Sequence, residues 1–249
     1  MIKNILSGIK AYSGTFKIIA NLGLWKYFWI PVLISLITAT LIFTSAYALS
    51  DNIGQFLSQW WVWDWGKNTV DSLSSVVGGI LIILLGFILY KHIVMALSAP
   101  FMGPVSEKIE AHLLGKRTPN PRDTIFMEQL WRGIRINLRN LSMEILLTLP
   151  IILIGLIPVI GLLSSILLFL VQGYYAGFGN MDYTLERHFK YNESINFVRR
   201  HKGAAIGNGI IFTLFLFIPV IGVIMVLPLS VTAATVKTVE LLKLEKQIG

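Results

Sequence analysis

The sequence has no cysteine and few charged residues, and both absences narrow the class of protein. Without cysteine there is no disulfide framework, no thiolate nucleophile and no cysteine-ligated metal. Charged residues make up 14% of the 249 residues, whereas soluble domains carry about 25%. Hydrophobic residues make up 55%, and the mean hydropathy is +0.70. This composition indicates an integral membrane protein.

The sequence also lacks the residue constellations that support catalysis. His92, His112, His188 and His201 are scattered, and none has a partner at the spacing of a zinc site or a serine triad. Gly207-Asn208-Gly209 is too short for a nucleotide-binding loop. We therefore expect neither an enzyme nor a bound metal or other cofactor. The net charge of +8 lies beside apolar segments, which favours anionic lipid over nucleic acid as a partner.

Five residues occur twice: Ile157-Pro158-Val159-Ile160-Gly161 returns as Ile218-Pro219-Val220-Ile221-Gly222. Each copy lies within a stretch without formal charge, residues 145–181 and 203–236, of 37 and 34 residues. One spanning helix needs about 20 residues, and two spans with a turn need about 40. Proline removes a helical donor and glycine ends a helix readily. We therefore expect helix breaks at Pro158 and Gly161, and at Pro219 and Gly222.

The arms on either side of the first break are short. Residues 145–157 and 161–171 hold 13 and 11 residues, each enough for only part of a hydrocarbon core about 30 Å thick. We interpret both stretches as helical hairpins that enter the bilayer partway and return. The alternatives are a pair of kinked spanning helices, or two short full spans in each stretch. Broken backbone at membrane depth must be buried in protein, so the tips should pack on each other or on a partner subunit.

Two further segments are long enough to cross the membrane completely. Residues 27–50 and 72–90 are uncharged and predict two transmembrane helices. The loop between them, 51–71, carries three aspartates and one lysine and holds four tryptophans typical of an interfacial aromatic belt: Trp60, Trp61, Trp63 and Trp65. Four lysines and no acid precede residue 51. The positive-inside rule therefore places this loop outside and both termini in the cytoplasm.

The remaining segments have the pattern of amphipathic helices. In residues 1–26, apolar side chains recur every three to four positions opposite lysines, which predicts a helix lying on the inner membrane surface, followed by a turn. Residues 98–141 predict two cytoplasmic amphipathic helices, the first ending at Gly115. Residues 237–249 predict a cytoplasmic tail. The whole chain, 1–249, is expected to be one membrane domain.

The central segment places basic and acidic residues close to the membrane. Arg132, Arg135 and Arg139 recur on one side of the second amphipathic helix. This row could hold lipid phosphates, pair with Glu107 and Glu110, or attract an anionic solute. Glu144 begins the next apolar run. It could carry protons, extend its carboxylate to the membrane interface, or pair with Arg139 or Lys91.

The order of these features resembles the CysZ family of bacterial inner-membrane sulfate permeases. The residues that carry the resemblance are dispersed over nearly the whole chain: Ala99-Pro100-Phe101, Glu107, Glu110, Gly115, both proline-glycine breaks, Asp182-Tyr183, His188, Arg199, Lys202, Gly209, Leu227-Pro228 and Ala233-Ala234-Thr235. The resemblance implies an all-helical fold with two long spans and two half-membrane hairpins. It also implies homo-oligomers built from dimers, and uptake of sulfate for cysteine synthesis.

One stretch departs from the family. Members that bind sulfate have a Gly-x-Arg-Arg pattern where the first span begins, and the matching residues here are Gly23, Leu24, Trp25 and Lys26. A helix N-terminus offers free amides to an oxyanion, and Lys26 adds a positive charge. The bidentate fork of an arginine is missing. We expect anion binding at these four residues, with Arg132, Arg135, Arg139, Arg199, Glu107 and Glu110 forming a possible charged network.

The sequence therefore predicts an all-α integral membrane protein of the bacterial inner membrane. The first functional hypothesis is a permease for sulfate or a related oxyanion that supports cysteine biosynthesis. The second is a non-transporting membrane scaffold or regulator of the same fold that uses its amphipathic helices on anionic lipid. An enzyme acting on lipid is the weakest hypothesis, because the residues for it are missing.

Overall fold

The computed structural model describes residues 1–59, 67–115, 125–155, 157, 160–218 and 221–248, and every regular element in these ranges is helical. The elements are α1 (Ile2–Lys10), α2 (Thr15–Asn21), the 3₁₀ helix η1 (Leu24–Tyr27), α3 (Trp29–Ser58), α4 (Lys67–Leu114), α5 (Phe126–Gly155), α6 (Gly161–Leu185), α7 (Tyr191–Arg200), α8 (Lys202–Leu216) and α9 (Ile221–Ile248). The prediction of an all-α fold is confirmed.

Five described segments are long and apolar enough to cross a membrane: Trp29–Phe56, Ile88–Leu114, Phe126–Gly155, Gly161–Leu185 and Met225–Glu245. The chain is therefore a multi-pass type of membrane protein by length and composition. The sequence analysis predicts two full spans, whereas five segments here are long enough to cross. The numbers differ because several helices continue beyond the uncharged runs on which the prediction rested.

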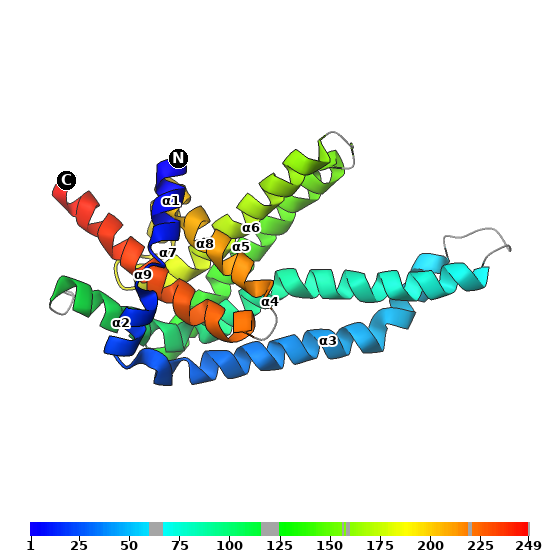
Figure 1. Cartoon of the computed structure of the whole chain (residues 1–249), viewed down its shortest axis with the longest axis horizontal. Coiled ribbons are helices and arrows are strands. Elements are labelled where there is room, and N and C mark those ends of the chain that lie inside the picture. Colours follow the sequence, from blue (N-terminus) through cyan, green and yellow to red (C-terminus); the bar gives the residue numbers. More distant parts are fainter. Residues whose placement is uncertain (60–66, 116–124, 156, 158–159, 219–220, 249) are drawn as a thin grey trace.

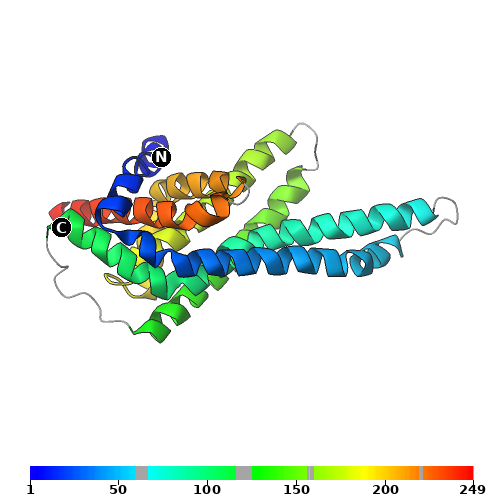
Figure 2. The same cartoon turned by 60° about the horizontal axis from the view of Figure 1, so that its bottom comes forward.

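Helices α3 and α4 form a long antiparallel arm that extends away from the rest of the molecule (Figures 1 and 2). The expected loop over residues 51–71 is wrong in extent, since α3 continues to Ser58 and α4 begins at Lys67. Small residues allow the two helices to approach closely. A Cβ at Gly54 would collide with the backbone of Ser75, and one at Gly78 would lie 2.7 Å from the Ser50 carbonyl oxygen. The four tryptophans lie outside the described residues.

Two expected boundaries are absent because single helices run through them. Helix α4 has 48 residues, so the second span and the first amphipathic segment are one helix despite Pro100 and Pro104. Helix α5 likewise joins the second amphipathic segment to the first hairpin arm. Proline is tolerated inside a membrane helix where neighbouring helices and side chains satisfy the backbone groups that it frees, so Pro100 and Pro104 do not end α4. The expected tail after residue 236 is also part of a helix, α9.

The N-terminal segment is two helices rather than one. Helix α1 ends at Lys10, and Gly14, with a φ of 85°, is the residue at which α2 starts. One face of α1 packs on α8, where Gly8 leaves no room for a side chain against the Ala204 carbonyl. The Tyr12 hydroxyl lies 2.8 Å from the Asn208 carbonyl oxygen and 2.6 Å from Ser230 Oγ, and burial raises the Tyr12 pKa. This helix is thus docked on protein, with Lys3 and Lys10 exposed on its other side.

Both copies of the repeated pentapeptide turn the chain between two helices. The Gly161 amide donates to the Ile157 carbonyl at 3.0 Å, and the Gly222 amide donates to the Ile218 carbonyl at 2.9 Å. A side chain at Gly161 would crowd the Gly155 carbonyl, and one at Gly222 would collide with the Phe215 carbonyl. Helix α5 ends at Gly155 and α6 begins at Gly161, while α8 ends at Leu216 and α9 begins at Ile221, so each glycine lies in the first turn of the second helix. That Gly161 and Gly222 cause the breaks stays a prediction. Pro158 and Pro219 lie outside the described residues.

The lengths of the arms differ from the sequence prediction. Helices α5 and α6 have 30 and 25 residues because they continue beyond the uncharged run. Helix α8 has 15 residues, about 22 Å at 1.5 Å per residue, which is less than a full span. Whether the hairpins stop partway through the bilayer stays a prediction.

The body of the molecule is built around α6 and α9. Helix α9 packs against α4, α6 and α8, and α6 packs tightly against α8. One apolar cluster joins α4 to α9 through Met102 and Leu227, and a second joins α6 to α7 through Phe178 and Phe197. Polar side chains are also buried here, and Asn208 in α8 accepts from Asn180 Nδ2 at 2.9 Å and donates to the Ser230 carbonyl at 3.0 Å.

Candidate functional site

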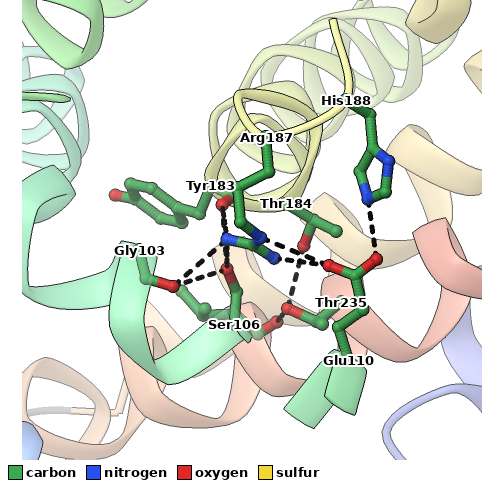
Figure 3. Close-up of polar contacts among 9 residues, drawn as sticks. Gly103, Ser106, Glu110, Tyr183, Thr184, Arg187, His188 and Thr235 are labelled. Atoms are coloured by element: carbon green, nitrogen blue, oxygen red, sulfur yellow. Dashed lines mark hydrogen bonds and ion pairs between the residues drawn. The ribbon is translucent and has the colours of Figure 1, made fainter. Parts of the chain in front are cut away.

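The turn after α6 is attached to α4 by a buried cluster of charged side chains (Figure 3). Arg187 Nη2 lies 2.9 Å from Glu110 Oε2, and His188 Nε2 lies 2.7 Å from Glu110 Oε1. The side chains of Arg187 and Glu110 are 6% and 1% exposed. Each carboxylate oxygen therefore has its own basic partner, which is what a buried carboxylate needs to remain charged.

Arg187 also binds the neighbouring backbone. Its Nη1 contacts the Gly103 carbonyl at 3.2 Å, Ser106 Oγ at 2.7 Å and the Tyr183 carbonyl at 3.0 Å. Ser106 Oγ in turn lies 2.8 Å from the Tyr183 carbonyl. All three guanidinium nitrogens are thus engaged in joining α4 to α6. An arginine with its donors used in this way stabilises the fold and has little capacity left for a ligand.

A second ion pair joins α5 to α6. Arg132 donates from Nε to Asp182 Oδ2 at 3.0 Å and from Nη2 to Asp182 Oδ1 at 2.9 Å, a bidentate arrangement. The same guanidinium donates to Ser194 Oγ at 2.7 Å and to the Phe189 carbonyl at 2.9 Å. Arg132 therefore connects α5 both to the end of α6 and to the first turns of α7.

The third cluster joins α4 to α5 where the arm leaves the body. Lys91 Nζ donates to Glu144 Oε1 at 2.6 Å, and His92 Nε2 lies 3.0 Å from Glu144 Oε2. The three side chains are between 1% and 3% exposed. His92 Nδ1 lies 3.4 Å from Asn137 Oδ1, two turns before Glu144 on α5. Of the alternatives that the sequence left open for Glu144, pairing with Lys91 is the one that the structure contains.

The other members of the expected network are not joined to these clusters. Arg135 stacks over the Tyr191 ring at 4.1 Å. Arg139 donates to Asn140 Oδ1 at 3.0 Å and lies over the Phe178 ring. Arg199 is exposed on α7, and within the described ranges Glu107 has no ion pair. The hypothesis that the arginine row pairs with Glu107 and Glu110 is wrong, because Glu110 is taken by Arg187 and His188 while Arg132 faces Asp182.

The predicted anion-binding stretch lies at the corner between α2 and α3. Gly23 has a φ of 60°, and η1 separates it from α3, so Lys26 is not at the N-terminus of the spanning helix as expected. Leu24 is completely buried. Trp25 packs on Phe16 and Phe28 with ring centres 6.3 and 6.2 Å away. Of the four residues, Lys26 alone offers an exposed charge to an anion.

A lysine from α4 reaches the same corner. Lys108 Nζ donates to the Tyr27 hydroxyl, and the ammonium groups of Lys108 and Lys26 lie 4.5 and 5.5 Å from the centre of the Tyr27 ring. Tyr27 precedes the span that begins at Trp29. The hydrogen bond from Lys108 lowers the Tyr27 pKa. The sequence analysis did not find this contact.

Other hollows and clusters offer less to an anion. A groove of about 540 Å³ between α3 and α4 is lined almost wholly by apolar side chains, with Thr38 and Ser45 as exceptions. Such a lining suits an acyl chain better than an oxyanion. Over the described ranges, no three His, Asp or Glu side chains are placed to hold a metal ion.

The sequence analysis identified many of the charged residues, but it did not identify which of them pair with one another. The sequence analysis names Asp182 only through the family resemblance, treats His92 and His188 as histidines without a catalytic partner, and does not identify the ion pairs of Arg187. A usable signal was present, because charges return abruptly at residue 182 after an uncharged run. Charges at the end of an apolar helix that do not face water need partners on neighbouring helices.

Known proteins resemble this chain over most of its length. A family model described as Sulfate transporter CysZ/Etoposide-induced protein 2.4 matches residues 11–226. The sulfate transporter CysZ of Pectobacterium atrosepticum is 25% identical over 234 residues, covering 92% of this chain and 83% of that protein. The sulfate transporter CysZ of Vibrio cholerae is 26% identical over 245 residues, covering 92% and 91%. That of Salmonella typhimurium is 22% identical over 242 residues, covering 94% and 92%. Since the family model covers well over half of the sequence, this chain belongs to the sulfate transporter CysZ/etoposide-induced protein 2.4 family.

Proposed function

We propose that this protein is a permease for sulfate or a related small oxyanion in the bacterial inner membrane. The observation that carries the proposal is the match to relatives named sulfate transporters over more than nine-tenths of the chain. The helices that are long enough to span a membrane fit that role. The sulfate taken up would serve sulfur assimilation and cysteine biosynthesis.

The proposed orientation has both termini in the cytoplasm and the tip of the α3–α4 arm outside. The lysine-rich N-terminal segment and the acidic 51–71 segment support it through the positive-inside rule. In Figure 1 the two termini lie at one end of the molecule, and the tip of the arm lies at the other. An oxyanion would meet the Gly23–Lys26 corner from the cytoplasmic side.

The buried pair of Lys91 and Glu144 supports half-membrane hairpins. Because the two side chains are in contact, Lys91 of α4 and Glu144 of α5 lie at the same depth in the membrane. From that level α4 runs back through residues 67–90, about 36 Å, which is enough to cross the hydrocarbon core. From the same level α5 runs on through residues 145–155, about 16 Å, or half of that depth. The α5–α6 pair also leaves the body at an angle to the arm (Figures 1 and 2), which shortens its reach across a membrane.

A half-depth hairpin cannot close a path through the bilayer by itself. The turns at Ile157 and Ile218 have exposed isoleucines, and lipid does not hydrogen-bond with broken backbone nearby. We therefore include in the proposal a homo-oligomer built from dimers, in which hairpin tips of neighbouring subunits cover each other.

Sulfate flux separates this function from the alternative of a non-transporting scaffold or regulator. Purified protein is reconstituted into liposomes, and uptake of radiolabelled sulfate is compared with that of empty vesicles. We expect uptake well above the empty-vesicle rate, and a loss of most of it in Lys26→Ala. Lys10→Ala, an exposed lysine on α1, is the matched control and should transport normally. Absence of flux for sulfate and for other small oxyanions would remove the permease and favour the scaffold.

A further inference from the structure

Lys26 and Lys108 form a pair of positive charges that the fold holds around one tyrosine. Their ammonium nitrogens lie 5.5 and 4.5 Å from the Tyr27 ring centre, so they are within about 10 Å of each other. Both lysines are exposed, and in the part of the chain that the structure describes neither forms an ion pair. Two like charges at this separation repel each other, and an anion bound near both would relieve the repulsion.

The Tyr27 hydroxyl has hydrogen-bonding capacity left for a ligand. Its oxygen accepts from Lys108 Nζ, and its own hydrogen has no acceptor among the described residues. A phenol whose oxygen accepts from an ammonium is a stronger donor to an anion. The corner thus offers hydrogen-bond donors from three side chains, two of them charged, and no acidic partner.

We propose that Lys26, Lys108 and the Tyr27 hydroxyl together form the oxyanion-binding site, and that Lys108 supplies its second positive charge. The site deepens the proposed function, since it assigns two further residues to the anion-binding stretch. Trp25 is not needed in this site, because its ring packs on Phe16 and Phe28. The second cation comes from α4, a distant part of the sequence, and not from the residue next to Lys26.

The position of Lys108 is fixed by the buried cluster on the same helix. Glu110 lies two residues further along α4 and is held by Arg187 and His188. Ser106, two residues before Lys108, contacts the Tyr183 carbonyl. The body of the molecule therefore holds this part of α4 in place through the contacts of Ser106 and Glu110 (Figure 3). On the same stretch of α4, Lys108 Nζ donates to the Tyr27 hydroxyl at the α2–α3 corner. A preorganised cation binds an anion more tightly than a free side chain does.

The ligand chemistry is a tetrahedral oxyanion that carries at least one negative charge. Free sulfate has this chemistry, and so does the phosphate of an anionic lipid headgroup at the membrane surface. The binding experiment therefore has two arms. One uses protein in detergent without added lipid, and the other uses protein in nanodiscs with either zwitterionic or anionic phospholipid.

Equilibrium binding of radiolabelled sulfate tests the site directly. In detergent we expect Lys26→Ala and Lys108→Ala each to weaken binding by tenfold or more, and Tyr27→Phe to weaken it three- to tenfold. Lys10→Ala should bind as the original protein does, and Lys108→Arg should retain most of the affinity. If Lys108→Ala does not elute as folded protein in gel filtration, Lys108→Gln replaces it.

The outcomes separate this site from the proposed function. Equal sulfate affinity in Lys108→Ala and the original protein overturns the site, even if sulfate flux is normal. Lys108-dependent binding without flux in liposomes supports the site and overturns the permease. Sulfate binding that is lost in anionic but not in zwitterionic nanodiscs supports the site and assigns its occupant to lipid phosphate.

Discussion

The α3–α4 arm and the body around α6 and α9 are held together in different ways. Of the most apolar window of Trp29–Phe56 in the arm, 17% is buried, against 83% for Met225–Glu245 in the body. The arm is closed by small residues that allow two helices to touch. Among the described residues, the body contains two buried ionic clusters, and a third lies where the arm joins the body. In lipid, close packing stabilises helix pairs without burying charge. In the body, specific ion pairs also join neighbouring helices, and these pairs fix how far each helix is shifted along its axis relative to the next.

The largest expected effect comes from breaking the cluster at the junction of these two regions. Glu144→Gln leaves the Lys91 ammonium buried without a counter-charge, and loss of one partner in a buried pair costs about 3–5 kcal/mol. We expect the thermal unfolding midpoint in detergent to fall sharply. Glu107→Gln is the matched control, because Glu107 is half-buried and has no ion pair within the described ranges.

A double variant sharpens this test. Replacing both partners with apolar residues, Lys91→Met with Glu144→Leu, removes the unpaired charge and should recover much of the lost stability. If Glu144→Gln and Glu107→Gln unfold at the same temperature, the cluster does not stabilise the junction.

A smaller effect is expected inside the arm. Gly54→Ala places a methyl group against the Ser75 backbone, and such overpacking costs about 1–3 kcal/mol. Gly79→Ala is the control, since its Cβ would lie 3.5 Å from the Ser50 Cβ, an ordinary contact. The measurement is again the unfolding midpoint. Equal midpoints for the two variants would contradict the close α3–α4 packing.

The smallest effect is expected on the outer face of the arm. Leu36 is 44% exposed in α3, and in a bilayer this surface faces lipid that fills the space left by a shorter side chain. Leu36→Ala should therefore change the stability by no more than about 0.5 kcal/mol. A large loss in detergent and in nanodiscs alike would show that the face is covered by protein, as in an oligomer.

The sequence predicted local breaks and composition well, and partners between helices less well. The turns at Gly161 and Gly222 follow from proline and glycine within a repeated pentapeptide, and the Lys91–Glu144 pair follows from two isolated charges in apolar surroundings. Helix boundaries failed at Pro100 and near residue 144, because tertiary packing continues a helix through a weak break. The partners of Glu110 and Arg132 depend on how α4, α5 and α6 cross, which no local pattern encodes.

Cysteine labelling tests most directly whether the arm crosses the membrane while the hairpins stop partway. The chain has no cysteine of its own, so single substitutions give a clean signal with a membrane-impermeant maleimide. Gln59→Cys, at the end of α3, should be labelled from outside intact cells, and Lys10→Cys only from the cytoplasmic side.

Ile157→Cys and Ile218→Cys are the decisive variants, because both isoleucines are about half exposed in the isolated chain. The account predicts that neither is labelled from outside, since both tips lie within the hydrocarbon core or against a neighbouring subunit. Free labelling of either position from outside, at the rate of Gln59→Cys, would contradict it.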